Sequence, residues 1–208
     1  DGQSQGVALP IVEKLEQLVQ ETQSDAAELS EALQIQIVRG ELEIESEGRR
    51  IVVRIKERGS FAPGTADLAP EYFAVIAIIR EVIAKREGAV AVEGHTDDIN
   101  IRSNRFRSNW DLSAMRAVSV AQELFIDNVL DSRRFAVTGF ADTQPLVPND
   151  STQNRGRNRR VEIVIRQAID PTLQEQIEAL KNVDPELYQS FGLEAQSGIY
   201  NLPPSSIF

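Results

Sequence analysis

Two helical stripes, each followed by a short apolar strand, occupy the middle of the chain. Between residues 71 and 87, apolar side chains recur every three or four positions, and residues 89–93 follow as an apolar strand. The arrangement returns with a stripe over 111–127 and a strand over 134–140. This spacing puts the apolar side chains of each stripe on one helix face, which must be covered. Strands that alternate with helices favour a layered sheet with both helices on one side.

Alternating segments before and after this region extend the predicted sheet. Residues 42–55 alternate around a turn at Glu47-Gly48, which predicts a hairpin. Near the end, Val161, Ile163 and Ile165 alternate with charged residues, which predicts a half-exposed last strand. The segments 59–70 and 141–158 are rich in proline or polar residues and are predicted to be loops. The sequence therefore predicts an α+β fold.

The two ends of the chain are expected to lie outside this domain. Residues 1–10 are predicted to form a flexible leader, and residues 11–37 a helix with a narrow apolar stripe. The stripe suits either a docked amphipathic helix or a coiled-coil pairing. A short helix is predicted over 172–181, and the tail from Gly192 has no clear period. We therefore predict a leader and linker helix over 1–40, a domain over 41–167, and a C-terminal helix and irregular tail over 168–208.

The composition restricts the classes of function. A net charge of −10 over 208 residues opposes nucleic-acid binding, which needs a broad basic surface, although residues 155–160 form a local basic cluster. The chain has no cysteine and one histidine, so sites that need two imidazoles are excluded. No stretch is long and apolar enough to be predicted as a membrane helix. The start at Asp1 indicates a mature or truncated product, which leaves room for a membrane anchor upstream.

The segment from Val92 to Val118 suggests the most specific chemistry. It places Asp97 at the end of an apolar strand and Arg116 within the following helix. A neighbouring acid and arginine can hold the ammonium and the carboxylate of an amino acid. Asn109, the expected helix N-cap, lies two turns before Arg116 and therefore on the same face. The alternative is a structural salt bridge, and in the free protein Asp97 and Arg116 could pair with each other.

Three short motifs in the same order resemble a known family. GHTD ends at Asp97, NWDLSAMRA begins at Asn109, and NRGRNRRVE spans residues 154–162. Together they resemble the OmpA-like peptidoglycan-binding domain, over about residues 42–166. The segments SFAPGTADLAP and SNWDLSAMRAVSVAQEL, with DINIRSNRFRS before the helix, most resemble the periplasmic region of flagellar motor stator B-subunits, the MotB and PomB type. Other members, such as Pal-type lipoproteins, have a shorter loop there.

This resemblance implies a fold, a ligand and partners. The fold would be a layered mixed β-sheet with helices packed on one face, preceded by a linker helix. The ligand would be the diaminopimelate-type peptide stem of peptidoglycan, with Asp97 on its ammonium and Arg116 on its carboxylate. The resemblance also implies roles for Thr96 at the strand end, for Asn109 beside Arg116, and for Asn158 and Arg159 near the stem carboxylates.

The function implied is non-enzymatic and needs no cofactor. The domain would anchor the stator of an ion-driven flagellar motor to the cell wall. It would be periplasmic and tethered to the inner membrane by an N-terminal segment that is not present in this chain. Its partners would be a second copy, in a homodimer, and the stator A-subunit.

Other functions remain open from the residues alone. The domain could tether another envelope protein, such as a lipoprotein or a secretion component. A cell-wall hydrolase has little support, because the sequence contains no GxSxG or HExxH motif and no cysteine.

The single histidine raises the question of a metal. Glu93, His95, Asp97 and Asp98 lie close in sequence and could form a carboxylate-rich Mg²⁺ or Ca²⁺ site. The interpretation that we favour has no metal, and His95 then caps the end of its strand by a side-chain hydrogen bond.

Overall fold

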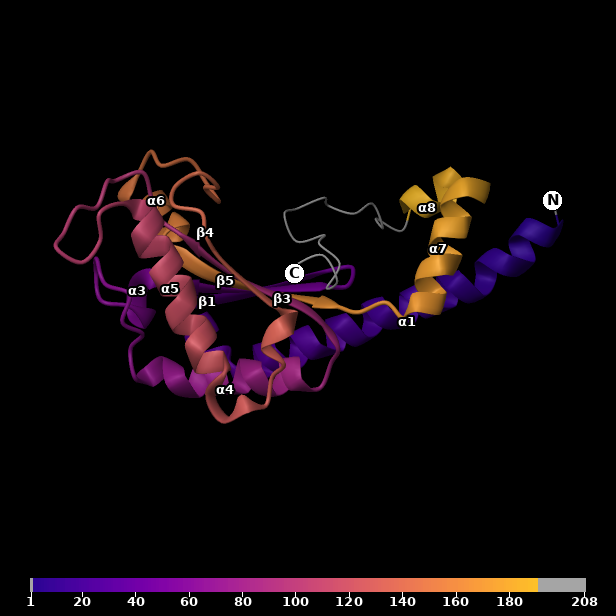
Figure 1. Ribbon diagram of the computed structural model, residues 1–208, viewed down its shortest axis with the longest axis horizontal. Helices are drawn as coiled ribbons and strands as arrows, with labels where there is room; N and C mark the ends of the chain where they lie inside the picture. Colours follow the sequence, from indigo (N-terminus) through magenta and orange to yellow (C-terminus); the bar gives the residue numbers. More distant parts are fainter. Residues whose placement is uncertain (1, 191–208) are drawn as a thin grey trace.

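The computed structural model describes residues 2–190 and has one mixed five-stranded sheet (Figure 1). The strand order is β1-β2-β5-β3-β4. All neighbouring strands are antiparallel except β3 and β4, which are parallel. The strands are β1 Leu42–Glu47, β2 Arg50–Lys56, β3 Gly88–His95, β4 Phe135–Gly139 and β5 Arg160–Gln167. The predicted hairpin is β1–β2, and the predicted α+β fold is confirmed.

Helices connect and flank these strands. The long ones are α1 Gly2–Ala32, α4 Glu71–Ala84, α5 Asn109–Leu124 and α7 Pro171–Val183. The short ones are α2 Gln34–Val38, α3 Glu57–Ser60, α6 Thr152–Asn158 and α8 Pro185–Ser190, with 3₁₀ turns η1 Ile126–Asn128 and η2 Ser132–Arg134. The segment predicted as a loop over 141–158 therefore contains a helix, α6. The tail predicted from Gly192 lies outside the described residues.

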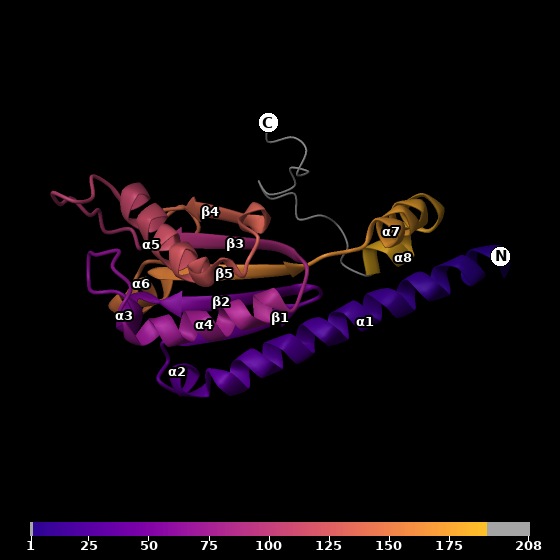
Figure 2. The same cartoon turned by 60° about the horizontal axis from the view of Figure 1, so that its bottom comes forward.

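One face of the sheet carries the apolar core. Val53, Ile163 and Val92 are register partners across β2, β5 and β3, and all three are fully buried. They belong to one cluster with apolar side chains of α4, α5 and the C-terminal half of α1. The helices therefore cover the same face of the sheet, as predicted, and Figure 2 shows α4 and α5 running along it.

The last strand differs from its prediction as a half-exposed strand. β5 lies between β2 and β3 in the middle of the sheet. Its polar residues Arg160 and Glu162, on the face opposite the core, are only 6% and 8% exposed. The alternation was read correctly, but the polar face of this central strand is itself buried. Ion pairs make that burial tolerable, since Glu162 pairs with both Arg160 and Arg54.

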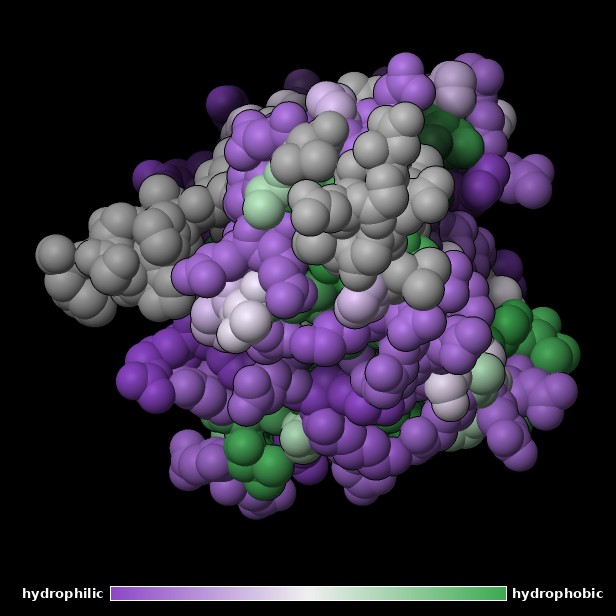
Figure 3. Space-filling view, turned by 90° about the vertical axis from the view of Figure 1, so that its right-hand side faces the viewer, coloured by the Kyte–Doolittle hydropathy of each residue, from purple (hydrophilic) through white to green (hydrophobic). Residues whose placement is uncertain are grey.

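The N-terminal helix is docked on the rest of the chain. α1 starts at Gly2, so residues 2–10 of the expected flexible leader are helical. Ile11 and Leu15 belong to one apolar cluster with residues of α7 and α8, whereas Leu29 and Leu33 join the main core. From this end the described surface is mostly hydrophilic (Figure 3). The apolar stripe is thus buried within the chain, as a docked amphipathic helix requires.

Polar contacts reinforce this docking. Arg86, just beyond α4, forms ion pairs with Asp25 at 2.9 Å and Glu21 at 3.1 Å. The buried hydroxyl of Thr22 donates a hydrogen bond of 2.7 Å to the side-chain oxygen of Gln167 at the end of β5. Within residues 2–190, no helix combines the length and apolarity needed to cross a membrane.

Candidate functional site

The candidate site lies at the sheet edge where β3 and β4 end. Because these strands are parallel, both C-terminal ends meet at one edge. The amide of Thr96 donates to the carbonyl of Ala141 at 2.8 Å, and the amide of Phe140 donates to the carbonyl of Gly94 at 2.8 Å. These bonds continue the pairing of β3 and β4 beyond the strands. They hold the segment that carries Thr96 and Asp97, both of which are buried.

Asn109 fixes the loop that follows Asp97. Ser108, not Asn109, caps α5 through its side-chain oxygen, so the predicted cap is displaced by one residue. The side-chain nitrogen of Asn109, Nδ2, instead donates to the backbone carbonyls of Asp97 at 3.2 Å and Ile99 at 3.1 Å. Its side-chain oxygen accepts from the amide of Ile101 at 3.0 Å. Asn109 therefore holds the start of the long loop against α5.

Two glycines let α5 approach the sheet closely. Gly94 and Gly139 are register partners on β3 and β4. A Cβ atom at Gly94 would lie 1.9 Å from the carbonyl oxygen of Ser113, and one at Gly139 would lie 2.5 Å from the amide nitrogen of Ala114. Both contacts involve helix backbone, so no side chain fits at either position without movement of α5. The Ser113 hydroxyl also accepts from the amide of Ala141 at 3.0 Å.

Pairing between β2 and β5 brings a further acid to this edge. Lys56 and Arg160 are register partners, and the next residues outward are Glu57 and Arg159. The amide of Glu57 donates to the carbonyl of Arg159 at 3.0 Å. Glu57 was not among the residues predicted for the site. Only the pairing of the two strands places it there, since it stands 102 residues before Arg159.

Four charged side chains of alternating sign form a continuous row. Arg116 Nη2 lies 2.5 Å from Glu57 Oε1, the other oxygen of Glu57 accepts from Arg159 Nε, and Arg159 Nη1 lies 2.6 Å from Asp97 Oδ2. The expectation that Asp97 and Arg116 pair directly in the free protein is therefore wrong. Instead, Glu57 pairs with Arg116, and Arg159 pairs with Asp97.

The two arginines of this row differ in exposure. Arg116 is 1% exposed; its Nε donates to the carbonyl of Thr65 at 2.7 Å, and its guanidinium lies 5.2 Å from the ring centre of Phe61. Among the described residues, its Nη1 has no hydrogen-bond partner. The Arg159 side chain is 31% exposed. Burial lowers the pKa of Arg159, but hydrogen bonds and charge interactions with Asp97 and Glu57 raise it overall, so Arg159 stays charged.

Asn158 is placed next to this row but uses its side chain elsewhere. Its oxygen accepts from the amides of Leu146 at 2.9 Å and Val147 at 3.1 Å. Its nitrogen donates to the carbonyl of Val147 at 2.8 Å and to the side-chain oxygen of Asn149 at 2.7 Å. Because an amide side chain offers two donors and two acceptor positions, this set is complete. In the free protein Asn158 therefore holds the loop after β4.

His95 does not cap its strand. Its ring is 2% exposed and stacks on Phe140 with centroids 5.3 Å apart. Within the described part of the chain, neither ring nitrogen has a hydrogen-bond partner. Burial, followed by the charge of Arg160, lowers the pKa of His95 to about 4, so the ring is neutral at pH 7. The neighbours of His95 are Glu93 and Glu162 rather than Asp97 and Asp98.

Comparison with known proteins places the chain in a family. Residues 60–159 match the OmpA family. The uncharacterized protein YtxE of Bacillus subtilis is 37% identical over 58% of this chain and 50% of its own length. Motility protein B of the same organism is 32% identical over 60% of this chain and 48% of its own length. The chain thus spans about half the length of these relatives.

Solved structures agree with this assignment. The cell wall anchor of the T6SS from Pseudomonas aeruginosa is 35% identical, with a TM-score of 0.62 over 67% of this chain and 97% of that chain. A MotB-like protein from Desulfovibrio vulgaris is 31% identical, with a TM-score of 0.66 over 74% and 99%. The periplasmic domain of Helicobacter pylori MotB is 27% identical, with a TM-score of 0.57 over 69% and 92%. The chain therefore belongs to the OmpA family and carries a domain homologous to the periplasmic domain of MotB.

Proposed function

We propose that this domain binds the diaminopimelate-type peptide stem of peptidoglycan and so anchors the stator of an ion-driven flagellar motor to the cell wall. The observation that carries the proposal is the row of alternating charges from Asp97 to Arg116. The free end of a diaminopimelate side chain bears an ammonium and a carboxylate on one carbon. An acid beside a guanidinium matches that pair of charges, and bidentate pairing favours arginine for the carboxylate.

The ligand would enter the row by exchange of partners. Its ammonium would replace Arg159 at the Asp97 carboxylate, and Arg159, the more exposed arginine, would turn to the ligand's carboxylates. Within the described residues, the Nη1 atom of Arg116 makes no hydrogen bond, so its N–H groups could hold a carboxylate. Thr96 and Asn109 would keep the Asp97 loop in place, and Asn158 would position the segment that leads to Arg159. Because the protein's own charges satisfy one another first, exchange would avoid leaving buried charges unpaired.

The site assignment is tested by Asp97→Asn, with Asp98→Asn as its matched control. Asp97 is buried in the row, whereas its neighbour Asp98 is exposed. We expect Asp97→Asn to weaken binding to purified sacculi about ten- to hundredfold, because one charge-assisted hydrogen bond contributes about 1.5–3 kcal/mol. Asp98→Asn should bind like the wild type. Circular dichroism melting checks that both variants are folded, and equal binding by all three proteins would refute the assignment.

The domain limits and partners belong to the same proposal. Residues 41–167 would be the wall-binding module, 1–40 the linker, and 168–208 a C-terminal extension. The protein would be periplasmic and held to the inner membrane by a segment ahead of the linker. It would act as a homodimer with a stator A-subunit. The homology to motility protein B supports these roles, and its greater length is consistent with a further segment.

A second function is favoured by one observation. The T6SS cell wall anchor is 35% identical to this chain, and the match covers 97% of the anchor structure. The module could therefore tether a secretion system instead of a motor. Deletion of the whole gene separates the two: loss of swimming with secretion intact supports the motor, and the reverse result supports the secretion system. Sacculus binding alone cannot distinguish them, since both need it.

A further inference from the structure

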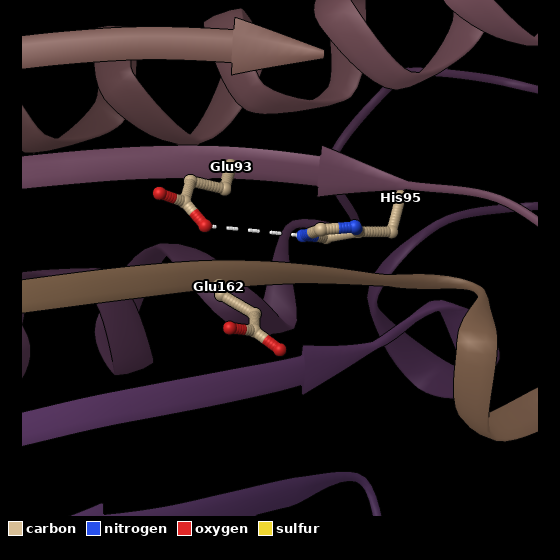
Figure 4. A group of neighbouring side chains, drawn as sticks. All are labelled: Glu93, His95 and Glu162. Carbon is tan, nitrogen blue, oxygen red and sulfur yellow. Dashed lines mark ion pairs between the residues drawn. The ribbon is translucent and has the colours of Figure 1, made fainter. Parts of the chain in front are cut away.

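Three potential metal ligands meet on the sheet face opposite the apolar core. Glu93 and Glu162 are direct register partners on β3 and β5, and His95 follows two residues after Glu93 on the same face. One ligand atom from each side chain lies within 4.8 Å of the others. Figure 4 shows Glu93 and the imidazole of His95 between β3 and β5, with the carboxylate of Glu162 beside β5 on the side of β2. Like charges placed directly opposite each other across antiparallel strands are unfavourable, so Glu93 and Glu162 need a compensating charge.

The histidine provides an independent sign of a missing partner. His95 is 98% buried, yet neither ring nitrogen has a hydrogen-bond partner among the described residues. Its Nε2 lies 4.0 Å from Glu93 Oε2, too far for a hydrogen bond but close enough to share an ion. A buried polar group without a partner costs free energy and calls for an explanation such as a bound ion. The neutral imidazole has the lone pair that a metal requires.

Nearby arginines bind Glu162 directly, whereas Arg160, Arg50 and Arg166 act on Glu93 through their charges. Arg160 Nε at 2.6 Å and Arg54 Nε at 3.0 Å both bind the same oxygen of Glu162, Oε1. Its other oxygen, Oε2, makes neither of these contacts. The Glu93 side chain is 16% exposed, which opens the group to solvent.

We propose that Glu93, His95 and Glu162 bind one divalent transition-metal cation of the Zn²⁺ type. One imidazole nitrogen and two carboxylate oxygens form a mixed donor set that suits Zn²⁺, with water completing the coordination. Mg²⁺ and Ca²⁺ prefer oxygen ligands alone. Since Arg54 and Arg160 repel a cation, binding is weaker than at a structural zinc site. The metal would join β3 to β5 beside Thr96 and Arg159, at the edge that carries the charge row.

The single histidine makes this proposal directly testable. In an untagged, isotope-labelled chain, every imidazole NMR signal comes from His95. We expect titration with ZnCl₂ to shift these signals to saturation at one equivalent, whereas MgCl₂ leaves them unchanged. Unchanged His95 signals at saturating Zn²⁺ would overturn the proposal, and so would an equal response to Mg²⁺.

Two variants and a control locate the metal. Glu93→Gln and Glu162→Gln keep the side-chain shape but remove a charged ligand. Each variant should weaken Zn²⁺ binding at least about tenfold, because mutation even of residues that only orient the metal ligands has effects of that size. Glu43 lies on β1 and pairs with Lys56 of β2. The control variant Glu43→Gln should bind Zn²⁺ like the wild type. Amide spectra confirm the fold of each variant. If all three bind like the wild type, the metal is bound elsewhere and the proposal fails.

Discussion

Replacing Glu57 by alanine is expected to lower the free energy of unfolding by about 3–5 kcal/mol. Glu57 forms the ion pairs with both Arg116 and Arg159, and its side chain is 11% exposed. Its removal leaves the 1%-exposed guanidinium of Arg116 without a counter-ion among the described residues, where its remaining hydrogen bond is to the Thr65 carbonyl. An uncompensated buried charge is among the most costly defects in a protein interior.

Urea unfolding followed by circular dichroism measures this effect. Asp67→Asn is the matched control, because Asp67 forms a bidentate ion pair with Arg105 on the surface. Exposed pairs contribute little, so this variant should unfold close to the wild type. Glu57→Gln, which keeps the shape and some hydrogen bonds, should fall between the two. If Glu57→Ala were no less stable than Asp67→Asn, the row of charges would not be the structural element described above.

The second large effect is expected from Gly94→Ala. A methyl group at this position would meet the carbonyl oxygen of Ser113 at 1.9 Å, so α5 must move away from β3. Overpacking of this kind costs about 1–3 kcal/mol, which lowers the melting temperature by several degrees. Because α5 carries Asn109 and Arg116, sacculus binding should fall as well.

Gly156→Ala is the control for this substitution. Gly156 lies within α6, and the nearest atom to an added Cβ is Arg159 Nη2 at 3.7 Å, an ordinary contact. Alanine is the better helix former, so this variant should be as stable as the wild type or slightly more so. Wild-type melting and binding by Gly94→Ala would show that the close packing of α5 on the sheet is unimportant.

Local patterns predicted most of the fold. The apolar spacing in residues 71–93 correctly predicted α4 and β3. Each of these elements buries one face, and the spacing of its apolar residues follows that face. The helix α6 was missed because its seven residues include Gly156 and several polar residues with no apolar stripe. Its start depends on the Ser151 side chain, which accepts from the amide of Asn154 at 3.1 Å. A cap and a short turn leave little trace in hydrophobic periodicity.

The candidate site was predicted less completely than the fold. The motifs identified Asp97, Arg116 and Arg159, but not the acid that lies between the two arginines. Glu57 stands 59 residues before Arg116 in the sequence and belongs to none of the three motifs. Its place follows from the antiparallel register of β2 and β5, which a single sequence does not contain. The roles predicted for the site residues in ligand binding stay predictions that the sacculus experiment addresses.

The docking of α1 imposes a rule of helical phase on the chain. Leu15, in the cluster with α7, and Ala26, in the main core, are eleven residues apart. At about 3.6 residues per turn this is about three whole turns, so both side chains point the same way. One residue inserted between them would rotate one cluster by about 100° against the other, whereas seven would nearly restore the alignment. Helical phase therefore rules out single-residue insertions, and the rise of about 1.5 Å per residue limits longer ones.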